Sequence, residues 1–164
     1  MVSLYLAVSL GTTACVPLAP LIWVPHDHEY RSVDWRMCEP TYQAQLFKEK
    51  GVVLSWIFRP SSDTFAGTLL LEVPSGTQAS FDSRDLTISA AGSTRTVAMF
   101  KGGWPVQAQD GYSNFSLGFG MPVQRTPSPI VVILPPLRIN TEVFKLPPFT
   151  FETKRQAMVV GLCQ

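Results

Sequence analysis

The sequence carries little charge. Only 15% of its 164 residues are Asp, Glu, Lys or Arg, and the formal net charge is +1. Typical soluble domains carry about 25% charged residues. A nucleic-acid-binding domain needs a basic face, which a balance of 13 basic and 12 acidic residues does not indicate. We therefore expect no nucleic-acid partner.

Sequence signals of catalysis are equally scarce. The chain has no Gly-x-Ser-x-Gly nucleophile elbow. It has no phosphate-binding loop, because the Gly-Phe-Gly at 118–120 lacks the third glycine and is followed by Met-Pro. Its acidic residues form no distinctive pair of the kind that glycoside hydrolysis requires. We expect no catalytic residue and no cofactor, and we interpret the protein as non-enzymatic.

The only two histidines, His26 and His28, are weak candidates for a metal site. In an extended chain, residues two apart point the same way, so both imidazoles would meet one metal with Asp27 or Glu29 nearby. Zinc sites need three or four ligands, usually from more than one segment, and no second cluster is obvious. The favoured interpretation is a solvated polar patch in a proline-rich linker, and no metal is expected.

The first 25 residues contain no charge, which points to export. Residues 1–10 are apolar or small, and small residues follow as far as Ala14, a pattern typical of a signal peptide. A transmembrane helix needs about 20 uninterrupted apolar residues. Pro17 interrupts the run before that length is reached. The sequence therefore predicts a signal peptide over 1–14.

The end of this segment, Thr12-Thr13-Ala14-Cys15, resembles the lipobox of bacterial lipoproteins. In that family the signal is cut before the cysteine, which then carries acyl chains such as palmitate. The resemblance implies a lipid anchor at Cys15 in the cell envelope. Since Val16 is not Asp, it also implies the outer membrane, facing the periplasm. Two features depart from the family: Thr12 stands where Leu is typical, and no Lys or Arg precedes the apolar run. An ordinary cleaved signal and a buried N-terminal strand with a core cysteine are the alternatives.

Lipidation of Cys15 would leave one possible disulfide pair, Cys38 and Cys163. A bridge between them would tie both ends of the domain together in an oxidising compartment. Closing so long a loop stabilises by roughly 4–5 kcal/mol in the chain-entropy model. The alternative is two free thiols. We predict the bridge.

The segment after Cys15 is rich in proline, which favours extended polyproline II structure. We predict a lipid-anchored extended tether over 15–36, followed by the folded domain over 37–164. Trp23 and Trp35 would either pack on that domain or lie at the membrane interface, where indole rings settle.

The body of the chain shows a β pattern. Residues 42–47 and 52–58 predict a hairpin, because Val52, Leu54, Trp56 and Phe58 alternate onto one face. A short helix over 40–49 is the alternative. The run 129–135 is β-branched and bounded by prolines, so we expect a strand buried on both faces. The other strand-like segments are 64–73, 85–90, 93–101, 112–119, 137–140, 143–146, 149–153 and 157–162.

Strands at intervals of about 8–12 residues, without a long helix, are typical of an antiparallel sandwich or barrel. We predict a mainly β fold with a single antiparallel β-sandwich, immunoglobulin-like rather than a closed barrel. The stretch 135–152, PPLRINTEVFKLPPFTFE, resembles uncharacterised proteobacterial lipoproteins. That resemblance implies no particular activity.

One loop carries a candidate binding residue. Trp104 stands between Gly-Gly and Pro, and an aromatic ring at a loop tip is a typical interface anchor. Tyr112 would share that surface. The alternative places Trp104 folded back to cap the sandwich. We expect a lipid-anchored envelope protein with a binding or accessory role and an envelope protein as partner. The alternatives are a carbohydrate- or small-ligand-binding module that uses Trp104 and Tyr112, and a hydrolase or metal-dependent enzyme.

Overall fold

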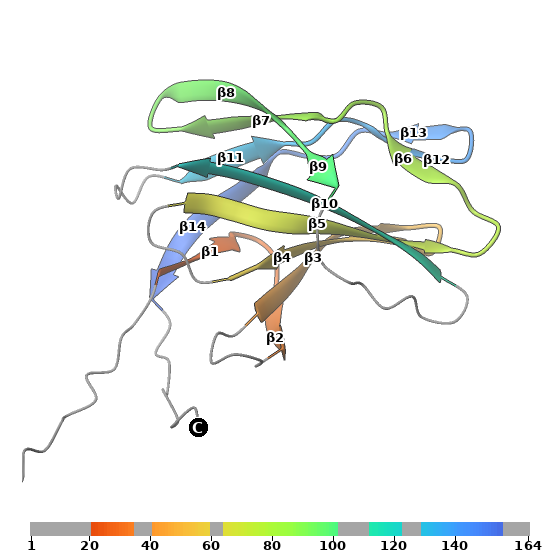
Figure 1. Ribbon diagram of the computed structural model, residues 1–164, viewed down its shortest axis with the longest axis horizontal. Coiled ribbons are helices and arrows are strands. Elements are labelled where there is room, and N and C mark those ends of the chain that lie inside the picture. The colour runs from red at the N-terminus through yellow and green to blue at the C-terminus, as the bar shows by residue number, and fades with distance from the viewer. Residues whose placement is uncertain (1–20, 35–40, 60–63, 102–111, 123–128, 156–164) are drawn as a thin grey trace, which may run out of the picture.

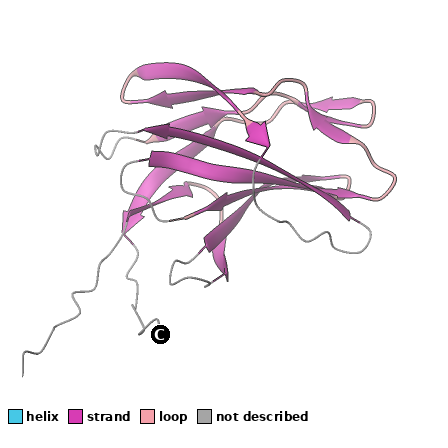
Figure 2. Ribbon diagram, in the orientation of Figure 1, coloured by secondary structure: helices cyan, strands magenta, loops and turns pink. Residues whose placement is uncertain are grey.

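The computed structural model describes residues 21–34, 41–59, 64–101, 112–122 and 129–155. Within those ranges the chain forms strands and turns, with no helix (Figures 1 and 2). The strands are β1 (Leu21–Pro25), β2 (Tyr30–Asp34), β3 (Thr41–Glu49), β4 (Val52–Phe58), β5 (Thr64–Pro74), β6 (Ala79–Phe81), β7 (Asp85–Ala90), β8 (Ser93–Ala98), β9 (Phe100–Lys101), β10 (Tyr112–Pro122), β11 (Ile130–Ile133), β12 (Leu137–Ile139), β13 (Glu142–Phe144) and β14 (Phe149–Arg155).

These strands build an antiparallel β-sandwich, which confirms the predicted fold class. One layer is a five-stranded sheet in the order β1-β14-β11-β7-β8, and the other is a six-stranded sheet in the order β2-β3-β4-β5-β10-β9 (Figure 1). A small sheet, β13-β12-β6, lies at one end. All strand pairings in the described residues are antiparallel. The immunoglobulin-like assignment stays a prediction.

The predicted hairpin at 42–58 is confirmed as β3 and β4. Its turn places Lys50 at φ 51° and Gly51 at φ 78°. Positive φ at both central turn residues gives the twist that matches the flanking strands. The helical alternative over 40–49 is wrong, because β3 pairs with strands on both of its sides and alternates Tyr42 and Ala44 into the core.

The core between the two sheets is built around aromatic rings. Trp56 is 1% exposed, and its ring centroid lies 4.9 Å from that of Phe119 and 5.0 Å from that of Phe151. Phe65 stacks on the same indole at 5.5 Å. A Cβ atom on Gly67 would lie 2.4 Å from Cζ2 of Trp56. The absence of a side chain at Gly67 therefore makes room for the indole.

The structure corrects the predicted tether for residues 21–34. β1 pairs along its length with β14, and β2 pairs with β3. Trp23 is 7% exposed and packs edge-on against Phe65, with ring centroids 5.6 Å apart. Proline is compatible with an edge strand, where one row of amides has no ladder partner. Pro25 ends β1 at such an edge, so the prolines there do not prevent sheet pairing.

The run 129–135 is also corrected in part. Ile130 and Val132 of β11 are buried, whereas Val131 is half-buried and Ile133 is 44% exposed. One face of this strand therefore packs on the core and the other approaches solvent, as is usual in antiparallel sheets. The segment 157–162 lies outside the described residues.

Candidate functional site

Several of the sequence-predicted site residues lie outside the described part of the chain. They are Cys15, Cys38, Trp104 and Cys163, together with Trp35. Lipidation, the disulfide and the tryptophan anchor therefore stay predictions.

The two histidines do not converge on one site. Residues 26 and 27 form a turn after β1, so the chain is not extended here as the metal hypothesis assumed. The imidazole of His26 lies beside Glu152 of β14, with Nδ1 3.2 Å from Oε2. The ring of His28 instead contacts that of Phe149, at 5.8 Å between centroids. Among the described residues, no group of three His, Cys, Asp or Glu side chains is placed to hold a metal ion.

His26 makes contacts that hold the β1–β2 turn against β14. The backbone N–H of His26 donates to the carbonyl of Thr150 at 2.8 Å. Glu152 also forms an ion pair with Lys154, whose Nζ lies 3.2 Å from Oε1 of Glu152. Hydrogen bonds from Lys154 and then from His26 lower the pKa of Glu152. A cavity of about 470 Å³ adjoins this group. The ion pairs are solvent-exposed, so their contribution to stability is small.

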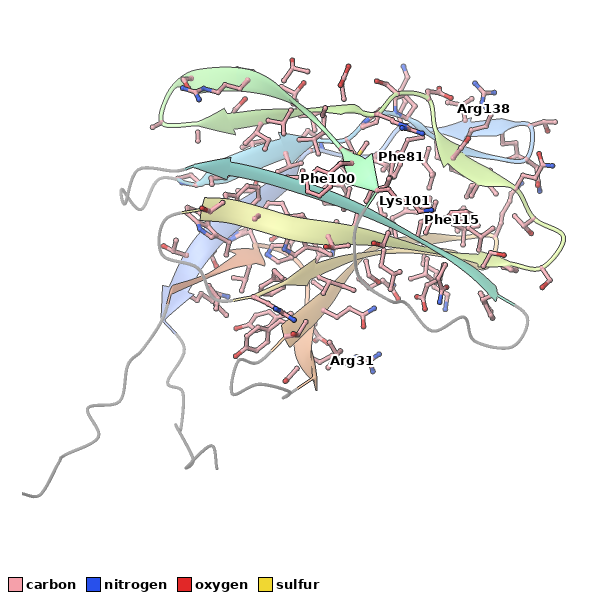
Figure 3. All side chains as sticks on the ribbon, viewed as in Figure 1. Arg31, Phe81, Phe100, Lys101, Phe115 and Arg138 are labelled. Atoms are coloured by element: carbon pink, nitrogen blue, oxygen red, sulfur yellow. The ribbon has the colours of Figure 1, made fainter. Side chains whose placement is uncertain are left out.

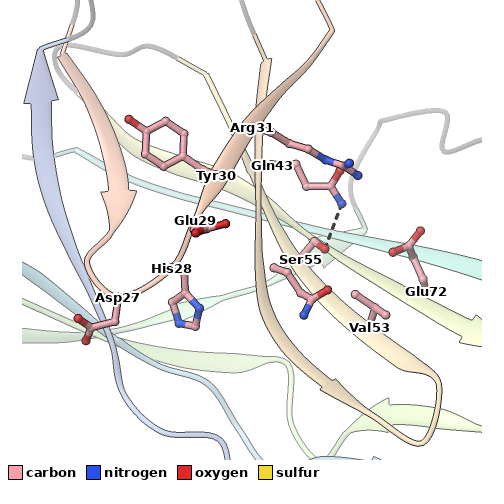
Figure 4. Close-up of a pocket in the computed structure, with 10 residues that line it drawn as sticks. Asp27, His28, Glu29, Tyr30, Arg31, Gln43, Val53, Ser55 and Glu72 are labelled. Atoms are coloured by element: carbon pink, nitrogen blue, oxygen red, sulfur yellow. Dashed lines mark hydrogen bonds between the residues drawn. The ribbon is translucent and has the colours of Figure 1, made fainter.

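A second, larger cavity crosses the outer face of the six-stranded sheet. Its volume is about 590 Å³, and we call it the outer-face groove (Figure 4). The β1–β2 turn lies at one end and β5 at the other. The lining residues come from that turn and from strands β2 to β5: Asp27, His28, Glu29, Tyr30, Arg31, Gln43, Gln45, Val53, Ser55 and Glu72.

Strand alternation explains why polar side chains gather here. Along β4, Leu54 and Trp56 point into the core, so Val53 and Ser55 point to the outer face. Directly across the ladder, Gln45 pairs with Ser55 and Glu72 pairs with Val53. Residues that pair directly across two strands share one face of the sheet. The groove is therefore the outward half of the same strands that build the core.

One hydrogen bond orients the floor of the groove. Gln43 Nε2 donates to Ser55 Oγ at 3.1 Å (Figure 4). Gln43 lies opposite Ile57, so its side chain reaches diagonally across to Ser55. Ser55 is 1% exposed. This bond fixes the amide of Gln43 with its carbonyl and second N–H available beside the groove.

Irregular pairing shapes the strands on this side. The β3–β4 register shifts between Gln45 and Phe47, and the β2–β3 register shifts between Ser32 and Asp34. Such bulges bend a strand and increase its twist, and they often re-aim side chains near sites. Both irregularities lie in strands that line the outer-face groove.

The groove offers hydrogen bonds rather than apolar contact. Val53 is its one aliphatic lining residue. Two amides, the hydroxyls of Ser55 and Tyr30, an imidazole, a guanidinium and three carboxylates supply the donors and acceptors. Arg31 projects from β2 (Figure 3) and lies beside Gln43, its partner across the ladder (Figure 4). The alternation of Gln43 and Gln45 was visible in the sequence, but the contribution of residues 27–31 was not, because they were assigned to the tether.

Of the two predicted ligand-binding residues, Trp104 and Tyr112, only Tyr112 lies among the described residues. It is 40% exposed, and it lies opposite Pro74 at the start of β10. Asn114 pairs with Glu72, so Tyr112 is the diagonal neighbour of Glu72 on the outer face. Tyr112 therefore flanks the β5 end of the outer-face groove.

Comparisons with protein-family models, with curated proteins and with solved structures find no match to this chain. The described residues contain no helix that is long and apolar enough to span a membrane. The residues of the outer-face groove and the N-terminal sequence are therefore the features of this chain that bear on its function.

Proposed function

We propose that this protein is a non-catalytic binding module of the bacterial cell envelope, anchored by lipid at Cys15, that holds a polar ligand in the outer-face groove. The observation that carries the proposal is the groove itself. It gathers ten residues from the β1–β2 turn and four neighbouring strands around about 590 Å³. Ligand sites of small molecules have volumes of about 300–1,000 Å³.

The position of the groove on paired strands supports a binding role. Side chains on strands are held more precisely than those on loops. Gln43 is further oriented by its bond to Ser55, and Glu72 is half-buried on β5 between two paired strands. A ligand would therefore meet donors and acceptors whose positions are set before it binds, which reduces the ordering cost of association.

The direct test is an NMR titration of the ¹⁵N-labelled protein with an extract of the envelope of the cells that produce it. We expect amide shifts that concentrate at Gln43, Gln45, Ser55 and Glu72, and we expect the Gln45→Ala variant to need about two- to tenfold more extract to reach the same shifts. Thr96→Ala is the matched control, because Thr96 is exposed on β8 in the other sheet. Shifts that avoid the groove, or that follow the same titration curve in Gln45→Ala, would refute this function.

The anchor has its own test. The intact mass of the protein from native membranes should correspond to a chain that begins at Cys15 and carries added acyl mass. The Cys15→Ser variant should lack that mass. A chain that keeps residues 1–14 without modification would contradict the lipoprotein proposal and leave the groove proposal unaffected.

A further inference from the structure

We propose, resting on the function above, that the ligand of the outer-face groove is a neutral, hydroxyl-rich carbohydrate chain that lies across strands β2 to β5 and stacks on Tyr112. Three features carry this step: the kind of polar groups on the floor, the balance of charge, and the span between Arg31 and Tyr112.

The floor of the groove is made of groups that match sugar hydroxyls. A hydroxyl both donates and accepts, and the amide of each of Gln43 and Gln45 also offers a donor and an acceptor. Ser55 is buried and orients the amide of Gln43. Neighbouring hydroxyls on a sugar ring present two such groups side by side, which suits the paired oxygens of Glu72 and the forked donors of Arg31. A neutral polyol therefore has partners along the whole floor.

The charge of the groove disfavours an anionic ligand. Asp27, Glu29 and Glu72 supply three carboxylates against the single guanidinium of Arg31. Like charges across an interface are strongly unfavourable. The side chain of Asp27 is 86% exposed, so water screens its charge toward ions of either sign. Gln45, Ser55 and Val53, which line the centre of the groove, carry no charge and therefore suit a neutral ligand.

A polypeptide partner fits this surface less well. The cores of protein–protein interfaces are enriched in aromatic residues and depleted of charge. The centre of the groove instead offers Gln45, Ser55 and the short aliphatic side chain of Val53. It provides no apolar pocket for an anchoring side chain, whereas a sugar ring needs hydrogen bonds on its rim and one stacking surface.

The dimensions indicate an oligosaccharide. Arg31 on β2 and Tyr112 on β10 are separated by four strand spacings, through β3, β4 and β5. Strands lie about 4.8 Å apart, so the distance across the strands is about 19 Å. The strand register places Arg31 level with Gly118 of β10, six residues from Tyr112, which adds about 20 Å along the strand. The span therefore runs diagonally over about 28 Å, longer than one sugar ring. The half-exposed ring of Tyr112 lies where the chain would leave the sheet beyond Glu72.

The experiment divides the envelope extract into three portions and titrates each into the ¹⁵N-labelled protein. One portion is untreated, one is oxidised with periodate, which cleaves vicinal diols, and one is digested with protease, which is then inactivated. We expect the shifts at Gln45 and Glu72 to survive protease and to disappear after periodate. Tyr112→Ala should weaken the binding of the untreated extract by about three- to tenfold, and Tyr112→Phe should retain it.

The other outcomes overturn the inference in recognisable ways. Shifts that vanish with protease and survive periodate would identify a polypeptide ligand, which refutes the carbohydrate and keeps the groove as a binding site. Shifts that survive both treatments would identify a ligand that is neither a carbohydrate with vicinal diols nor a polypeptide, which refutes the inference. Equal binding by Tyr112→Ala and the unsubstituted protein would remove the stacking subsite. An untreated extract that causes no shift in the groove refutes the proposed function itself.

Discussion

The two faces of the six-stranded sheet differ sharply although they are built by the same strands. The inner face presents Trp56, Phe65 and Phe119, whose rings contact one another and are almost inaccessible to solvent. The outer face presents Gln43, Ser55 and Glu72 around an open groove. Because successive residues of a strand point to opposite faces, core packing and the lining of the groove are assigned to alternate positions. Substitutions at neighbouring residues should therefore affect different properties.

The largest effect should come from Trp56→Ala. The indole is 1% exposed and contacts three phenylalanine rings, so its loss leaves a cavity at the centre of the core. We expect a loss of about 3–5 kcal/mol in the free energy of unfolding, measured by chemical denaturation. Val53→Ala, on the other face of the same strand, should lower the free energy of unfolding by less. Similar losses of unfolding free energy in the two variants would show that the two faces contribute equally to stability.

The second effect tests how tightly the inner face is packed. Gly67→Ala would bring a methyl group within 2.4 Å of the Trp56 ring, so the indole must move. We expect a loss of about 1–3 kcal/mol in unfolding free energy. Gly120→Ala is the matched control on the neighbouring strand, because its new Cβ would lie 3.4 Å from Cβ of Ala66. Equal stability of both variants would show that the core has room at Gly67.

The third effect belongs to the outer face. Gln45→Ala and Glu72→Gln remove groups that line the groove without touching the aromatic core. We expect unfolding free energies within about 0.5 kcal/mol of the unsubstituted protein. Binding of the envelope ligand should weaken by about two- to tenfold for each variant, as loss of one hydrogen bond predicts. Titration followed by amide shifts measures the second quantity, and denaturation measures the first.

The smallest effect concerns the exposed contact between the β1–β2 turn and β14. Lys154 and His26 hold the pKa of Glu152 below its ordinary value of 4.5. A carboxyl group whose pKa is lowered on folding stabilises the fold above its unfolded pKa and loses this contribution as pH falls through the folded value. The stability difference between the unsubstituted protein and Glu152→Gln should therefore be present at neutral pH and shrink below about 4.5. Denaturation curves across this range measure it, and a difference that grows on acidification would contradict it.

Much of the fold was readable from local patterns. The hairpin of β3 and β4 and the strand predicted over 85–90, which is β7, follow from alternation and turn residues. The misread segment was residues 21–34, where prolines near apolar residues indicated an extended tether. The strand β1 is stabilised by β14, which lies about 130 residues later in the chain. A local pattern holds no information about so distant a partner.

The candidate site was only partly visible. Tyr112 was identified as an exposed aromatic residue, and it does lie on the outer face of the six-stranded sheet. The histidines were noticed for metal chemistry, yet His28 lines the groove and His26 contacts Glu152. Gln43, Gln45 and Ser55 match no motif, because amides and hydroxyls are common on the solvent face of any strand. Only their convergence in the groove makes them a candidate site.

Local alternation in the sequence is enough to indicate the all-β character of this protein and the inward residues of β4, because a period of two is set by backbone geometry. Only long-range packing places β1 in the five-stranded sheet and β2 in the six-stranded one. It thereby brought the β1–β2 turn to the end of a groove that Gln43, Ser55 and Glu72 continue. Sheet order depends on pairing and burial between distant segments, and these are favourable only when the whole chain packs.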